Sequence, residues 1–172
     1  MKRLSFLLLF LPVVCFGESL QGQIANNYDW SISITSDNDA AWQIYCATTS
    51  NRKTVFVTSV DLASDKGGYF TIYSTNVART SFTGSKTGRT VSASQASSGI
   101  TSISSATTCT DASAPTGEIR WQGIVGASET YKVLGDGQSW ALTPGKALYV
   151  IKTNGAAGEI AAASFRLVET YK

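Results

Sequence analysis

The sequence predicts an all-β protein, and three observations lead to this fold class. After residue 17, apolar and polar residues alternate in many short runs, which is the period of a half-buried strand. Turns rich in Gly, Asn, Asp and Pro separate these runs. Helical periodicity is almost absent, and no repeat of roughly 20–50 residues suggests a propeller or a solenoid. We therefore expect a β-sandwich.

The expected strands follow one another at short intervals and suit one domain with a real core. They cover residues 30–35, 55–60, 69–73, 119–125, 131–134, 140–142, 147–152 and 160–171. Residues 80–110 differ, because Ser and Thr make up more than half of this stretch. We interpret it as polar edge strands and a long surface loop. The alternative, a disordered linker, would leave two pieces that are each too small for a good core.

The first 17 residues have the pattern of a secretory signal peptide. Lys2 and Arg3 precede an apolar run that is shorter than the roughly 20 residues of a transmembrane helix. Cleavage after Gly17 leaves no second run long enough for a membrane anchor. Cys15 allows a lipoprotein interpretation, but Val14 stands where the lipid-attaching machinery usually needs a small residue. We expect export through the inner membrane, first to the periplasm and then to the cell surface.

Charge and cysteine content agree with export. Lys2 and Arg3 account for the formal net charge of +2, so the mature chain is neutral and lacks a basic patch for nucleic acid. Once Cys15 is removed, the remaining pair, Cys46 and Cys109, predicts one disulfide in an oxidising compartment. A redox role is disfavoured, because the chain has neither a C-x-x-C motif nor a His to activate a thiolate.

The sequence contains no pattern that indicates an enzyme, a cofactor or a metal. The absence of His excludes Ser-His and Cys-His nucleophile pairs and His-ligated zinc. Residues 84–88 look like part of a phosphate loop but lack its first Gly. Residues 37–39 (Asp-Asn-Asp) could offer oxygens to calcium, yet they are ordinary turn formers and calcium needs about six or more ligands. Among the 12 acidic residues, no spacing selects a glycosidase pair.

Four tryptophans suggest one class of ligand. On an exposed face they could stack on sugar rings, whereas within strands Trp is more often a core residue. The four are Trp30, Trp42, Trp121 and Trp140. They support one of two functions that we carry forward, a self-contained secreted β-sandwich that acts as a carbohydrate-binding module.

Both ends of the mature chain resemble the subunits of chaperone–usher fimbriae, the pilins. Residues 18–25 alternate apolar and polar side chains and precede a convincing first strand. At the other end, Gly158 stands about a dozen residues before the penultimate Tyr171, a spacing similar to that of the closing pilin strand. Glu169 departs from the alternation, unless a bulge between Leu167 and Tyr171 resets its phase.

This resemblance implies an immunoglobulin-like β-sandwich that lacks its last strand. Residues 29–172 would form the sandwich, and residues 18–28 would be an N-terminal extension that completes a neighbouring subunit by β-augmentation. The implied donor-strand residues are Leu20, Gly22 and Ile24. The implied acceptor edge, covered first by a periplasmic chaperone, contains Phe165, Leu167 and Tyr171.

The function that the sequence favours is therefore a structural or adhesive subunit of a surface fimbria, without catalysis, and the carbohydrate-binding module is its alternative. Its partners would be the chaperone and neighbouring subunits, with a host or surface glycan as a further candidate. One alternative stays open at this point. The segment from Leu20 to Ile24 could instead pair within its own chain as an ordinary edge strand.

Overall fold

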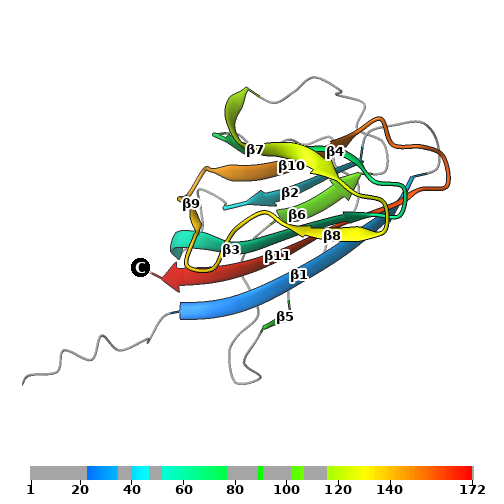
Figure 1. Cartoon of the computed structure of the whole chain (residues 1–172). Coiled ribbons are helices and arrows are strands. Elements are labelled where there is room, and N and C mark those ends of the chain that lie inside the picture. Colours follow the sequence, from blue (N-terminus) through cyan, green and yellow to red (C-terminus); the bar gives the residue numbers. More distant parts are fainter. Residues whose placement is uncertain are drawn as a thin grey trace, which may run out of the picture.

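A computed structural model describes residues 23–34, 40–46, 52–76, 89–90, 102–106 and 116–171. These residues form eleven strands in two antiparallel sheets, which face each other across a common core (Figure 1). The expected all-β class is confirmed. The described ranges include no helix that is long and apolar enough to cross a membrane.

The first sheet, sheet A, contains both ends of the described chain. Its strands lie in the order β5-β1-β11-β3-β8, and β9 pairs with β3 further along the same strand. The bounds are β1 (Gln23–Ser33), β3 (Arg52–Ser64), β5 (Arg89–Thr90), β8 (Glu129–Lys132), β9 (Trp140–Leu142) and β11 (Ile160–Tyr171).

The second sheet, sheet B, has the order β6-β2-β10-β4-β7. Its strands are β2 (Ala40–Tyr45), β4 (Gly68–Thr75), β6 (Ser102–Ala106), β7 (Gly117–Val125) and β10 (Ala147–Thr153). In both sheets, no two strands with consecutive numbers are neighbours. An immunoglobulin sandwich instead places several consecutive strands side by side. The two-sheet sandwich is therefore observed, whereas the immunoglobulin-like order is not confirmed.

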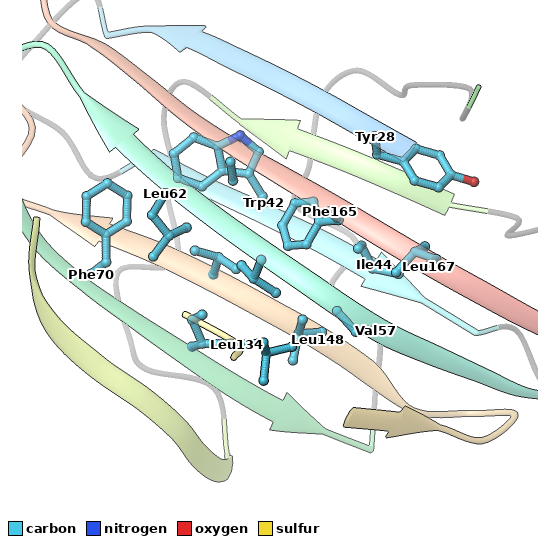
Figure 2. Close-up of a cluster of buried hydrophobic side chains, with 14 of the residues drawn as sticks. Tyr28, Trp42, Ile44, Val57, Leu62, Phe70, Leu134, Leu148, Phe165 and Leu167 are labelled. Atoms are coloured by element: carbon cyan, nitrogen blue, oxygen red, sulfur yellow. The ribbon is translucent and has the colours of Figure 1, made fainter. Parts of the chain in front are cut away.

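The core lies between the sheets and follows the alternation of the sequence. Figure 2 draws Tyr28 of β1 and Phe165 and Leu167 of β11 in one buried cluster with residues of sheet B. On the sheet B side, the rings of Trp42 and Phe70 stack with centroids 6.4 Å apart. Each fully buried side chain of this size contributes about 1.5–3 kcal/mol.

Three features of the fold differ from, or refine, the expectations. Strand β2 was not expected, although Trp42 and Ile44 alternate with more polar neighbours and are buried. Within the Ser/Thr-rich stretch, β5 and β6 are the outermost strands of their sheets, in agreement with the predicted polar edge strands. At each of the two register shifts between β11 and β3, the additional residue lies on β3. The alternation of inward and outward side chains along β11 therefore continues unchanged. Glu169 therefore points inward and is fully buried.

Candidate functional site

The N-terminal and C-terminal strands lie side by side in sheet A. β1 pairs with β11 without interruption from Gln23, opposite Thr170, to Ser33, opposite Ile160. β3 occupies the other edge of β11, so β11 is an interior strand in this chain. Ile24, one of the predicted donor residues, pairs with Glu169 of its own domain. Leu20 and Gly22 lie outside the described residues.

The predicted acceptor residues lie on β11. Phe165 is 3% exposed and Leu167 is fully buried, and both belong to the main core. Tyr171 pairs through its backbone with Arg52 at the end of the strand. The edge that was predicted to receive a neighbour's strand is covered by β1 of the same chain. The donor and acceptor roles remain predictions, because strand exchange between copies would use the same pairing.

Within the part of the chain that the structure describes, the other edge of β1 has much less support than the edge that pairs with β11. Within the described residues, β5 contacts this edge through two residue pairs, Asn26 with Thr90 and Asn27 with Arg89. At its C-terminal end, β1 is fastened to the turn before β11. The Ile34 N–H donates to the Glu159 carbonyl, and the Gly158 N–H donates to the Ile34 carbonyl, both at 2.8 Å.

A buried ion pair holds Glu159, the residue whose carbonyl accepts from Ile34. Lys152 Nζ of β10 donates to Glu159 Oε1 at 2.8 Å, and the two side chains are 2% and 1% exposed. Ser64 Oγ at the end of β3 donates to the same oxygen, and the Ala156 N–H donates to Oε2 at 2.9 Å. The carboxylate therefore links both sheets at one end of the sandwich.

The ionisation of Glu159 follows from these contacts. Burial alone raises the pKa of this carboxyl. Hydrogen bonds from Lys152, Ser64 and the Ala156 N–H, together with the charge of Lys152, outweigh burial and hold the pKa below its usual value. The group is accordingly ionised at neutral pH and forms a true ion pair with Lys152.

A polar groove of about 660 Å³ lies on the outer face of sheet A, above the junction of β1 and β11. Its floor is built by β1, β11 and β3, whose alternate residues point away from the core. The segment between β8 and β9 forms one wall, with residues 136–139 at its rim. The Val133 N–H, which donates to the Val60 carbonyl at 2.9 Å, attaches this segment to β3.

Strand register arranges the floor residues in two rows across the sheet. The first row contains Asn27, Arg166 and Ser59. The second row contains Asp29, Ser164, Asp61 and Lys132. With about 4.8 Å between strands, the second row spans about 14 Å. Amide, guanidinium, hydroxyl, carboxylate and ammonium groups thus face the same hollow.

The charges of the groove largely compensate one another. Lys132 Nζ donates to Asp136 Oδ1 at 2.6 Å. This hydrogen bond and the attraction between the two charges raise the pKa of Lys132 and lower the pKa of Asp136. Ser59 Oγ donates to Asp61 Oδ2 at 3.2 Å, and Arg166 adds a second cation. The groove consequently offers many donors and acceptors with little net charge.

The described tryptophans belong to the core or pack against it, as expected for Trp within strands, and they form no exposed platform in the described part of the chain. Trp42 is fully buried, while Trp121 and Trp140 are half-buried and pack against the core. The Trp121 ring lies 5.2 Å from the ring of Tyr131 and closes the sandwich edge between β7 and β8. The side chain of Trp30 lies outside the described part. The candidate site is therefore formed by polar residues rather than by Trp.

The predicted disulfide is described at one end only. Cys46 is buried and follows β2 directly, whereas Cys109 lies outside the described residues. Pairing of β6 with β2 puts Ala106 beside Ala41, at the opposite end of β2 from Cys46. A bond between the cysteines would require the chain after Ala106 to turn back along β2. The disulfide remains a prediction.

Sequence reasoning missed both the groove and the buried ion pair. The groove residues are ordinary polar residues of strands, and only the register across four strands brings Asp29 and Lys132 into one row. Outward polar positions in the alternation could have identified the outer face, but not its hollow.

Comparison with known proteins finds no matching family model, no similar curated protein and no similar solved structure.

Proposed function

We propose that this protein is an exported, self-contained β-sandwich that binds a carbohydrate in the polar groove of sheet A, without catalysing a reaction. The observation that carries the proposal is the groove itself, whose two rows of complementary polar side chains lie on a sheet that β1 completes. Its volume of about 660 Å³ falls within the range of about 300–1,000 Å³ that is usual for small-molecule sites.

The balance of charges supports a neutral, hydroxyl-rich ligand. An anion would face Asp29 and Asp61, and a cation would face Lys132 and Arg166. A hydroxyl group both donates and accepts, so it can use carboxylate acceptors and guanidinium or ammonium donors at once. Val168, half-buried at the groove, adds an aliphatic surface against which the C–H face of a sugar ring can pack.

The strand order supports this proposal by analogy. Without the edge strands β5 and β6 and the short strand β9, the orders are β1-β11-β3-β8 and β2-β10-β4-β7, which resemble a jelly roll, an architecture that includes lectin domains. The same architecture also serves unrelated functions, so the proposal of carbohydrate binding depends on the groove and not on the strand order alone.

Isothermal titration of the mature chain with maltose, cellobiose, lactose and N,N′-diacetylchitobiose tests the proposal. We expect at least one disaccharide to bind with a Kd near or below about 1 mM. Asp61→Asn should weaken that binding at least about tenfold, because a carboxylate acceptor is lost. Ser31→Ala is the matched control, since Ser31 lies on the same outer face but outside the groove. Absence of binding by all four sugars would refute the proposal.

A second candidate function is the fimbrial subunit that the chain termini suggest, on an immunoglobulin-like sandwich completed by a neighbour. The observation that favours it is the weak hold on the outer edge of β1, where two residue pairs with β5 are described. A neighbouring copy could supply β1 in the same register and cover Phe165 and Leu167 of β11. Exported subunits would then assemble by exchanging N-terminal strands.

A synthetic peptide of residues 23–34 distinguishes this candidate. If copies exchange β1, the mature protein should form fibres in electron micrographs, and the peptide should shorten them by occupying β11. A peptide with Ile32→Asp should have no effect, because Ile32 belongs to the core and is 3% exposed. A mature protein that stays monomeric with and without the peptide would exclude assembly of this kind.

A further inference from the structure

We infer that a ligand in the groove clamps the N-terminal strand β1 to sheet A, so that ligand binding and β1 docking are coupled. The inference rests on the proposed function, because it concerns the same groove. It assigns a role to Asn27 and Asp29, the groove residues that β1 supplies.

The groove lies across β1, which is paired along its whole length on one edge and, within the described residues, at only two positions on the other edge. The remaining groove walls belong to β11, β3 and the segment after β8, which are joined to one another by their own pairing. A ligand that touches both rows therefore connects β1 to the body of the sandwich.

Departure of β1 would remove part of the site. Asn27 begins the first row, and Asp29 begins the second row. A ligand that contacts these residues binds the docked state and not the open state. Mass action then shifts the equilibrium toward docking by the factor 1 + [L]/Kd. By reciprocity, any process that pulls β1 away releases the ligand.

Hydrogen exchange measured by mass spectrometry tests this coupling on the full mature chain. The probe is the tightest-binding disaccharide of the four named above, at ten times its Kd. We expect exchange of the β1 amides to slow about elevenfold, since the open state loses population by that factor. The variant Ser31→Cys/Ala162→Cys, which ties β1 to β11 through directly opposite residues, should remove this response.

Different outcomes separate the coupling from the proposed function. If the sugar slows hydrogen exchange of the β10 amides but does not change exchange of the β1 amides, the ligand binds without contacting β1. This result would overturn the coupling, while carbohydrate binding would stand. If titration detects binding but Asn27→Ala/Asp29→Ala retains wild-type affinity, the coupling is again overturned. If no sugar binds, the proposed function and the coupling both fail.

Discussion

Replacing Glu159 with Gln removes the negative partner of a lysine that is 2% exposed, and we expect a large loss of stability. At 2.8 Å and an effective dielectric constant of about 20, the gross attraction between the charges is about 6 kcal/mol. Desolvation offsets much of this, but removal of one partner leaves Lys152 buried without its counter-ion. Such losses amount to about 3–5 kcal/mol. For a domain of this size, the melting temperature should fall by about 6–20 °C.

Calorimetry or circular dichroism at pH 7 measures this change, and pH provides a second readout. The pKa of Glu159 is lower in the folded state, so its contribution to stability is present above its unfolded pKa of about 4.3. The contribution is lost as pH falls through the lowered value. The stability difference between wild type and Glu159→Gln should therefore shrink in acid.

Two further variants make this prediction sharper. Lys152→Met in the Glu159→Gln background should restore most of the stability, since no buried charge is left unpaired. Asp136→Asn, which breaks the exposed pair with Lys132, should leave the melting temperature unchanged within error. The reasoning is refuted if Glu159→Gln melts like wild type at pH 7, or if the double variant is no more stable than the single one.

Two other substitutions test the core and a turn, and a mass measurement tests the disulfide. Phe165→Ala should cost about 3–5 kcal/mol in urea denaturation, because it empties a site in the core. Gly68→Ala should lower the melting temperature, because the new Cβ would lie 2.9 Å from Cε and Nζ of Lys152 and the backbone φ is +140°; unchanged melting would contradict the packing described here. Intact mass spectrometry of protein produced in a bacterial periplasm should show the loss of two hydrogen atoms for a bond between Cys46 and Cys109. Alkylation of both cysteines without prior reduction would disprove that bond.

Most of the sheet could be predicted from alternation, because a strand with one buried face has a period of two. The expected strand at residues 160–171 coincides with β11, and that at 147–152 is nearly all of β10. β2 escaped prediction because its alternation occupies only six residues, two of which are alanines with little apolar contrast. Short strands of this kind are recognised by their partners rather than by their own composition.

Long-range pairing was the part that sequence could not decide. Alternation in residues 18–25 is equally compatible with a strand for a neighbour and a strand for the same chain, and the structure pairs Ile24 with Glu169 of its own domain. Lys and Glu are almost never fully buried unless they are paired, and Lys152 and Glu159 are buried because each pairs with the other. The seven-residue separation of this pair in the sequence gives no sign of burial, which depends on how β10 and the following turn pack against Ser64.

β1 completes the sandwich of its own chain and thereby forms one side of the groove. Ser31 and Ala162 lie directly opposite each other on β1 and β11, at a separation that suits a disulfide. The variant Ser31→Cys/Ala162→Cys, oxidised in the periplasm and analysed on a non-reducing gel, tests this arrangement directly. We predict that the cross-linked protein migrates as a monomer. A ladder of disulfide-linked multimers would show instead that β1 belongs to a neighbouring copy.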